Sequence, residues 1–129
     1  MSGQAFSIVP GNWAMVRLSP DAPLPDWALG ARSFVSITRT RDELSIVCEA
    51  RMVPEGARHQ AGWALLALRG PFAFSEVGVL ASVVGPLAAA GVPVFALSTF
   101  DTDYLLAPTE RRDDARAALV AAGHSFGGE

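Results

Sequence analysis

Two segments of the chain carry residues whose types and spacing suit the binding of a small charged molecule. The first is residues 70–80, where a Gly-Pro turn is followed by Ser75, Glu76 and Gly78. Ser is a helix-capping residue and Glu is favourable in a first helical turn, so a helix is predicted to begin at Ser75. A helix start presents unpaired backbone N–H groups and the positive end of the helix dipole, which together attract a carboxylate. Gly78 would let such a ligand approach the backbone closely.

The second segment is residues 98–104, where hydroxyl groups and two carboxylates crowd a short turn. Asp101 and Asp103 could hold an ammonium or guanidinium group through charge-assisted hydrogen bonds. These acids are few and their spacing matches no calcium loop, so no metal site is expected. A purely structural interpretation stays open for both segments. Ser75 would then only cap the helix, Gly78 would only allow close packing, and the Asp and Thr residues would only form the turn.

Catalytic chemistry is not indicated by the sequence. It contains no HExxH, GxSxG or paired-cysteine motif. All ten basic residues are arginine, which excludes Schiff-base chemistry, a Walker-type phosphate loop and a lysine general base. The single Cys48 lies in a strand-like run and is expected to be a buried structural thiol. His59 is expected in an exposed loop, and His124 at a helix end where a positive charge suits the helix dipole. We therefore expect no enzyme activity, no cofactor and no metal.

The composition limits the chain to one compact domain or two very small ones. It has 129 residues, of which 50% are hydrophobic, enough for a core without disulfides or a structural metal. A net charge of −3 with interspersed signs argues against a nucleic acid or a membrane surface as partner. The uncharged run at residues 77–97 is long enough to cross a bilayer, but Gly and Pro break it into shorter pieces. One cysteine points to a reducing compartment, so a cytoplasmic protein is expected.

Alternating and continuous apolar runs predict the elements that position these two segments. A helical turn is predicted at residues 26–29, a helix from Ser75 that contains Pro86, and a second helix from Thr109 to Gly123. Residues 49–62 are expected to form a loop. The predicted strands are residues 12–18, 33–38, 44–48, 63–68, 92–98, 104–107 and a short last strand at 124–126.

The sequence contains an internal repeat. Residues 13–18 recur in kind as residues 63–68, fifty positions later, and the hairpin at 37–46 matches 97–106 at an offset of sixty. The ten extra positions fall where the second half has a full helix and the first half only a turn. A strand, helix, strand, strand unit used twice predicts an α+β fold of the ferredoxin-like kind, with antiparallel sheets and helices on one face. Chance similarity between two apolar hairpins is the alternative.

Residues 70–81 and 91–106 together resemble the small bacterial ACT-domain proteins related to the CASTOR arginine sensors and to the regulatory ACT pair of aspartate kinases. The Ser-Glu-Val-Gly-Val-Leu and Ser-Thr-Phe-Asp-Thr-Asp-Tyr runs carry this resemblance. Residues 33–40 and 43–48 resemble that family's reduced N-terminal unit. The resemblance covers residues 12–126. It implies two ACT-type βαββαβ units, a reduced one at residues 1–62 and a complete one at residues 63–129.

The resemblance also implies a ligand site. In the relatives, backbone groups of the loop before the first helix hold the α-carboxylate and α-amino groups of an amino acid, and acids on the neighbouring hairpin hold its polar ends. Because the first unit lacks a full helix and so a second equivalent loop, another subunit is expected to supply one wall. The predicted ligand-binding residues are Ser75, Glu76, Val77, Gly78 and Val79 at the helix start, and Ser98, Thr99, Phe100 and Asp103 on the hairpin.

The sequence therefore predicts a non-catalytic, amino-acid-binding regulatory protein of the ACT type. The ligand is expected between residues 72–80 and 98–104, and the nearby acids favour a cationic amino acid. A homodimer or higher homo-oligomer is expected, with no nucleic-acid or membrane partner. The alternative is a protein-protein interaction or oligomerisation module whose pocket is vestigial, because exposed strand edges in so short a chain favour pairing between subunits.

Overall fold

The computed structural model describes residues 3–72 and 77–127, and the chain divides into two compact units. Gly11–Trp63 forms the small unit, and Met1–Pro10 with Ala64–Glu129 forms the large unit. The division falls inside two strands, β1 (Ala5–Leu18) and β4 (His59–Leu68), so each of them gives one end to each unit.

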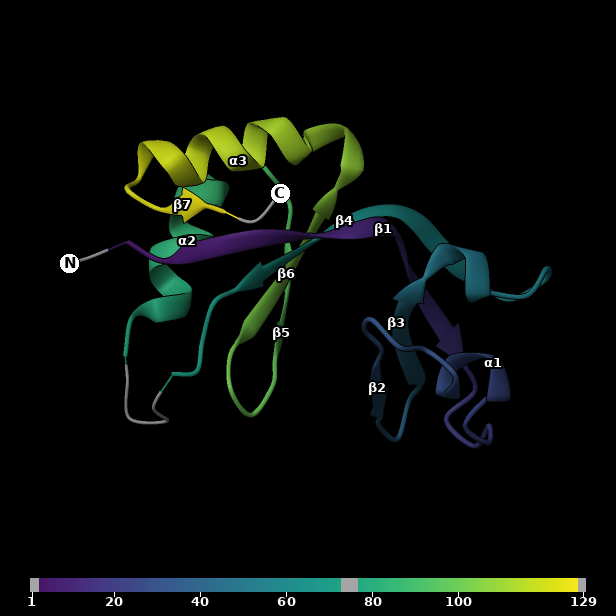
Figure 1. The fold of residues 1–129 in the computed structure, drawn as a ribbon. Helices are drawn as coiled ribbons and strands as arrows, with labels where there is room; N and C mark the ends of the chain where they lie inside the picture. Colours follow the sequence, from purple (N-terminus) through teal and green to yellow (C-terminus); the bar gives the residue numbers. More distant parts are fainter. Residues whose placement is uncertain (1–2, 73–76, 128–129) are drawn as a thin grey trace. The chain divides into compact units, whose positions relative to one another are not determined.

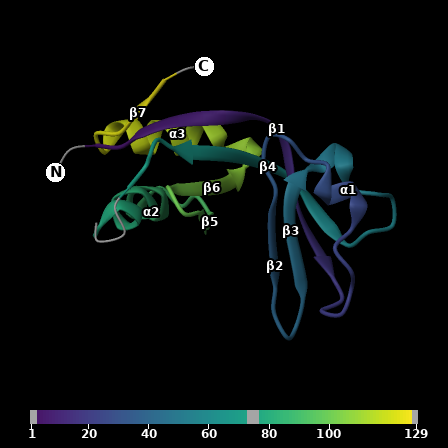
Figure 2. The ribbon, with the colours of Figure 1, turned by 60° about the horizontal axis from the view of Figure 1, so that its bottom comes forward.

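The small unit is a reduced ferredoxin-like unit. After β1 come the one-turn helix α1 (Asp26–Leu29), the strands β2 (Ser36–Arg39) and β3 (Leu44–Glu49), and a 3-10 turn, Ala50–Met52, before β4. The strands lie in the order β2-β3-β1-β4, and β3 is antiparallel to both of its neighbours (Figure 2). The first strand thus lies between the third and the fourth, and each helix is cut to about one turn. The core consists of Val16, Ala28, Ile46 and Cys48.

The large unit carries the full-length helices. It continues from β4 through α2 (Val79–Ala89), β5 (Phe95–Ser98), β6 (Asp103–Pro108), a 3-10 turn at Thr109–Arg111, α3 (Arg112–Ala121) and β7 (Ser125–Phe126). Its strand order is β7-β1-β4-β6-β5. The helices α2 and α3 lie together on one face of these strands (Figure 1). Their buried residues meet the strands in one hydrophobic core, which includes Leu66, Val83, Leu87, Leu105, Ala115 and Leu119. The predicted α+β, ferredoxin-like class is confirmed.

Two strands are longer than their hydrophobic patterns predicted. β1 begins at Ala5 and not at residue 12, since Phe6 is buried and pairs in parallel with Phe126 of β7. β4 begins at His59, inside the predicted loop, although its first four residues are exposed. Backbone pairing with β1, such as the 3.0 Å bond from Arg17 N to Arg58 O, holds this region. Hydrogen bonding can extend a strand where side-chain burial gives no alternating signal.

The helix α2 begins at Val79, later than predicted. Gly78 precedes it with φ of 82°, in the left-handed region that glycine adopts readily, and its carbonyl accepts the first helical bond from Ser82 N at 2.9 Å. The predicted cap Ser75 and its neighbour Glu76 lie outside the described residues. The buried helical positions are Val83 and Leu87.

His124 follows the end of α3, as predicted, but its side chain is a buried structural group and not a charge at the helix end. Its side chain is 6% exposed, and its Nδ1 accepts a 2.8 Å hydrogen bond from Gln4 N. The proton therefore lies on Nε2, which is 2.8 Å from the Ser82 carbonyl. Pro86 has no N–H with which to bond that carbonyl, four residues back in α2. The imidazole thus supplies the hydrogen bond that the helix itself cannot form.

The two hairpins confirm that the internal repeat is structural. β2 and β3 end in the pair Arg39–Leu44, and β5 and β6 end in the pair Ser98–Asp103, so each loop has four residues. Both loops begin with Thr, whose backbone N bonds the carbonyl of the fourth loop residue at 2.9 Å in the first hairpin and 2.8 Å in the second. Arg39 therefore corresponds to Ser98, one position short of the expected offset of sixty.

Candidate functional site

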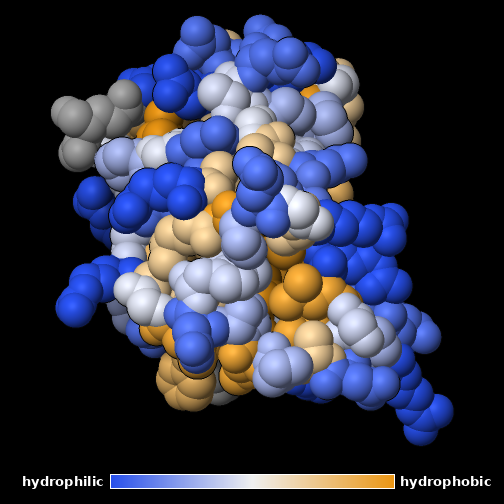
Figure 3. Space-filling model, turned by 90° about the vertical axis from the view of Figure 1, so that its right-hand side faces the viewer, coloured by the Kyte–Doolittle hydropathy of each residue, from blue (hydrophilic) through white to orange (hydrophobic). Residues whose placement is uncertain are grey.

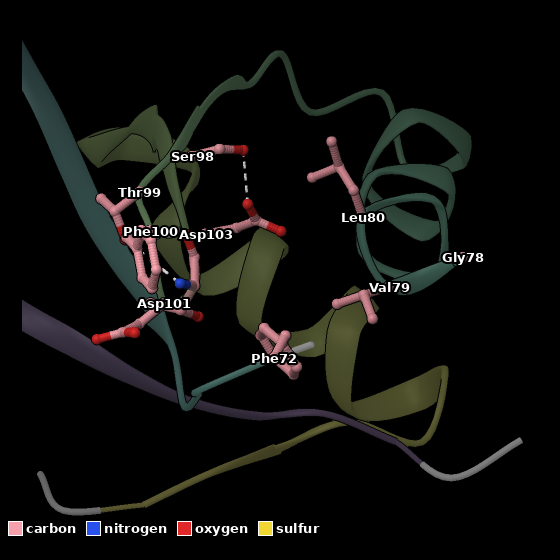
Figure 4. Close-up of a pocket in the computed structure, with 10 residues that line it drawn as sticks. Phe72, Gly78, Val79, Leu80, Ser98, Thr99, Phe100, Asp101 and Asp103 are labelled. Carbon is pink, nitrogen blue, oxygen red and sulfur yellow. Dashed lines mark hydrogen bonds between the residues drawn. The ribbon is translucent and has the colours of Figure 1, made fainter. Parts of the chain in front are cut away.

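An open cleft of about 330 Å³ lies in the large unit between the start of α2 and the β5–β6 loop (Figure 4). It is the place where the sequence predicted a ligand. The residues that line it are Phe72, Gly78, Val79, Leu80, Ser98, Thr99, Phe100, Asp101, Thr102 and Asp103.

The hairpin side of the cleft is anchored to the end of β4. The Thr102 hydroxyl donates a 3.0 Å hydrogen bond to the Leu68 carbonyl, and Phe72 N donates a 2.8 Å bond to the Asp101 carbonyl. Gly70 allows this approach, because a Cβ there would lie 2.7 Å from the Asp101 carbonyl oxygen and 2.9 Å from the Thr102 Cβ. These contacts thus fix the loop to the end of β4.

The helix side of the cleft is the start of α2. Its N-cap residue is Gly78, which has no side chain for a capping hydrogen bond and places the chain in a left-handed turn directly before Val79. The N–H groups of a first helical turn have no acceptor within the helix. Val79 and Leu80 belong to this turn, and both residues line the cleft. This edge of the cleft therefore favours a negatively charged group.

The opposite edge carries a carboxylate. Asp103 Oδ1 accepts a 2.6 Å hydrogen bond from the Ser98 hydroxyl, which fixes the direction of the side chain. In Figure 4 the Asp103 carboxylate points into the space between the hairpin and α2, whereas that of Asp101 points away from it. A carboxylate has about four acceptor positions, so one hydroxyl leaves Asp103 able to bind a cation. N–H groups at one edge and an acid at the other suit a zwitterion.

The structure brings together six of the nine predicted ligand-binding residues. Val77 is 89% exposed and does not line the cleft, and Ser75 and Glu76 lie outside the described residues. The residues of the cleft are Gly78, Val79, Ser98, Thr99, Phe100 and Asp103.

Four of the cleft residues stand outside the nine predicted ligand-binding residues. Leu80 lies in the first turn of α2, and its side chain points toward the cleft (Figure 4). Phe72 and Thr102 have no signal of their own, because they reach the cleft through the tertiary bonds to Asp101 and Leu68. Asp101 had been noted as an acid of the turn, and it lines the cleft with its side chain directed outward.

The ionisable groups outside the cleft offer little chemistry. Cys48 is fully buried as expected, and burial, followed by the nearby charge of Glu49, raises the pKa of its thiol. A raised thiol pKa disfavours the reactive thiolate. Within residues 3–72 and 77–127, no group of three His, Cys, Asp or Glu residues is placed to hold a metal ion. Over the same residues, none of the helices is long and apolar enough to span a membrane.

Solved structures of other proteins share this fold. The protein Atu0741 of Agrobacterium tumefaciens is 40% identical, with a TM-score of 0.93 over 100% of this chain and 96% of that one. The regulatory subunit of aspartate kinase from Thermus thermophilus is 14% identical, with a TM-score of 0.61 over 86% of this chain and 91% of that one. At such low identity, the second likeness shows the fold alone.

Sequence comparisons identify the family. The human cytosolic arginine sensor for mTORC1, subunit 1, is 39% identical over 49 residues, which are 37% of this chain and 15% of that relative. The match therefore spans about a seventh of the length of the curated relatives. Residues 58–121 match the model of an ACT domain, and residues 11–56 match the model of a separate N-terminal domain. The resemblance seen in the sequence is confirmed, and the chain belongs to the ACT-domain family.

Proposed function

We propose that this chain is a non-catalytic regulatory protein that binds a free amino acid in the cleft of the large unit. The observation that carries the proposal is the position of Asp103 across the cleft from the start of α2 at Gly78 and Val79. The cleft volume of about 330 Å³ lies in the range of small-molecule sites. The sequence match to a cytosolic arginine sensor supports the same class of function.

The chemistry of the cleft gives the amino acid an orientation. Its α-carboxylate would accept hydrogen bonds from the N–H groups of Val79 and Leu80. A cationic group, either the α-ammonium or a charged side chain, would bind Asp103. Phe72 and the Leu80 side chain would cover the aliphatic part between them. Because an acid holds the far edge, we propose a cationic amino acid over an anionic one.

The direct experiment is a thermal-shift screen of the twenty amino acids against the wild type and Asp103→Asn. A ligand at 100 times its Kd stabilises the folded state by about 2.7 kcal/mol, which raises Tm by several degrees at this chain length. We expect one or a few amino acids to do so in the wild type. Asp103→Asn should reduce their affinity at least tenfold, because it removes the charge that pairs with the cation.

The matched control is Asp113→Asn. It removes the same charge from an exposed residue of the first turn of α3, in the same unit but away from the cleft. Its ligand response should equal that of the wild type. A wild type that responds to no amino acid at millimolar concentration would contradict the proposal, as would equal responses of the two variants.

A second candidate is an interaction or oligomerisation module, which the exposed hydrophobic side chains around the cleft favour. Phe100 is 79% exposed and Phe95 45%, and β5 is an edge strand. Figure 3 shows one face of the molecule, on which hydrophobic patches lie among hydrophilic side chains. Phe100→Ser followed by light scattering separates the candidates. Loss of assembly in a protein that responds to no amino acid would favour the module.

Three finer points belong to this proposal. Ligand binding is assigned to the complete ACT-type unit, predicted over residues 63–129, and not to the reduced unit over 1–62. A homodimer or higher homo-oligomer is proposed because both β2 and β5 leave open strand edges. A cytoplasmic location is proposed because the related arginine sensor is named as cytosolic.

A further inference from the structure

In the small unit, an arginine side chain connects the hairpin to the segment before the helix. The Arg39 guanidinium donates one hydrogen bond from Nη1 to the Pro20 carbonyl and a second, of 2.8 Å, from Nη2 to the Ala22 carbonyl. Arg39 is the last residue of β2, and Pro20 and Ala22 lie between β1 and α1. The side chain therefore spans the distance from the hairpin to the chain that leads into α1.

The space that the Arg39 side chain spans is the small unit's counterpart of the cleft in the large unit. Arg39 and Ser98 each form the last strand pair before a four-residue loop. Since side chains alternate along a strand, the two residues point from the same face of their hairpins. Ser98 lines the cleft, which separates its hairpin from the segment between β4 and α2. Arg39 crosses the same place in the small unit.

The surrounding hydrogen bonds confirm that these places correspond. In the small unit, Arg17 Nη1 donates to the Leu18 carbonyl at 3.3 Å, and its Nη2 donates to the Asp42 carbonyl at 3.0 Å. In the large unit, the corresponding carbonyls of Leu68 and Asp101 are bonded by the Thr102 hydroxyl and by Phe72 N. In the large unit, a hydroxyl and a backbone N–H group bond these carbonyls beside the open cleft. In the small unit, the long side chain of Arg17 bonds both of them.

The geometry points to Arg39 as a built-in ligand: its guanidinium occupies the small unit's counterpart of the cleft, and its removal leaves a site for a free guanidinium-type cation at the carbonyls of Pro20 and Ala22. Only the large unit's cleft then exchanges ligand with solution, so the chain takes one ligand and not two. The assignment of Arg39 concerns a different unit and different residues from the proposed function, and only the count of one ligand per chain rests on that function.

The test is chemical rescue of Arg39→Ser, which gives position 39 the residue type that the large unit has at position 98. Guanidinium chloride is titrated in the low-millimolar range, far below denaturing concentrations, against sodium chloride at equal ionic strength. Tryptophan fluorescence reports on the small unit, because Trp13, Trp27 and Trp63 all belong to it. We expect a saturable fluorescence change and a rise in Tm of a few degrees in the variant, and neither in the wild type.

Arg41→Ser is the matched control, since Arg41 is an exposed arginine in the loop that follows Arg39 and its loss leaves the bridge from Arg39 intact. It should titrate like the wild type. Equal responses of the two variants would overturn the inference. If Arg39→Ser does not fold, Arg39→Lys is measured, because an ammonium group cannot make the same paired bonds. A Tm of Arg39→Lys equal to that of the wild type would also overturn the inference.

A final variant assigns the response to its unit. Adding Asp103→Asn to Arg39→Ser removes the acid of the large unit's cleft. Guanidinium rescue that persists in this double variant supports the site at Pro20 and Ala22. Rescue that disappears would place the cation at Asp103, which overturns the inference about Arg39 and leaves the proposed function standing.

Discussion

At the scale of single residues, the shape of the cleft depends on a few positions where adding or removing one atom would move the neighbouring groups. Gly70 is such a position, because the Asp101 carbonyl oxygen and the Thr102 Cβ occupy the space of a side chain. Asp103 is another, because the Ser98 hydroxyl fixes the direction of its carboxylate. The sequence predicted Asp103 as a binding residue because it is an acid in a short turn. Nothing in the sequence marked the close approach at Gly70, which arises only when β4 and the hairpin pack together.

Gly70→Ala should therefore damage the cleft. The added methyl group would push the hairpin loop from β4, at a cost of about 1–3 kcal/mol in the free energy of unfolding, typical of overpacking. Ligand affinity should fall with it. Gly85→Ala, inside α2 where a Cβ meets nothing within 4 Å, should stabilise by about 0.5–1 kcal/mol. Urea denaturation measures both. Equal effects of the two substitutions would contradict the account.

The buried thiol of Cys48 predicts a pH dependence of stability. Its pKa is raised above the ordinary value of 9.0 by burial and by the charge of Glu49, so the unfolded chain loses this proton at lower pH than the folded chain. The contribution to stability is complete below the unfolded pKa and is lost as the pH rises through the folded pKa. The difference in free energy of unfolding between the wild type and Cys48→Ala should thus narrow above about pH 9. A constant difference would contradict this prediction.

At the scale of elements, each helix and hairpin is completed by groups from elsewhere in the chain. The short helix α1 lies where the sequence placed it, at residues 26–29, because Pro and Gly bracket it. The bounds of β1 and β4 could not be read from hydrophobicity, because backbone pairing extends them through exposed residues. The role of His124 was equally hidden, since it follows from the missing N–H of Pro86 in a helix far away in sequence.

His124 and Pro86 should therefore be coupled. His124→Ala leaves the Ser82 carbonyl and Gln4 N without their partner, at a cost of about 2–4 kcal/mol in the free energy of unfolding. Adding Pro86→Ala restores an N–H that can bond the Ser82 carbonyl within the helix. We expect Pro86→Ala to recover part of the loss in the His124→Ala background. Strictly additive effects in this double-mutant cycle would show that the imidazole does not replace the helical bond.

At the scale of the whole molecule, one repeated unit serves two purposes. The repeat, the α+β class and the family could be predicted from the sequence, because the apolar runs and the two hairpins carry them. The sequence could not predict that a side chain spans the small unit's counterpart of the cleft. This feature rests on the hydrogen-bond partners of two corresponding residues, Arg39 and Ser98. The small unit holds its hairpin with arginines of its own, whereas the large unit keeps an open cleft beside the same loop.

Titration calorimetry should accordingly show one amino-acid ligand per chain in the wild type. Two equivalent sites per chain would contradict the assignment of ligand exchange to the large unit alone.

The most direct test of the central claim is a crystal structure of the chain grown with the amino acid that gives the largest thermal shift. We predict density in the cleft of the large unit, with a ligand carboxylate oxygen about 2.7–3.2 Å from the N–H nitrogen of Val79 or Leu80 and a ligand nitrogen at Asp103. A ligand bound at any other place, or a cleft filled by protein side chains in the presence of saturating amino acid, would contradict the account.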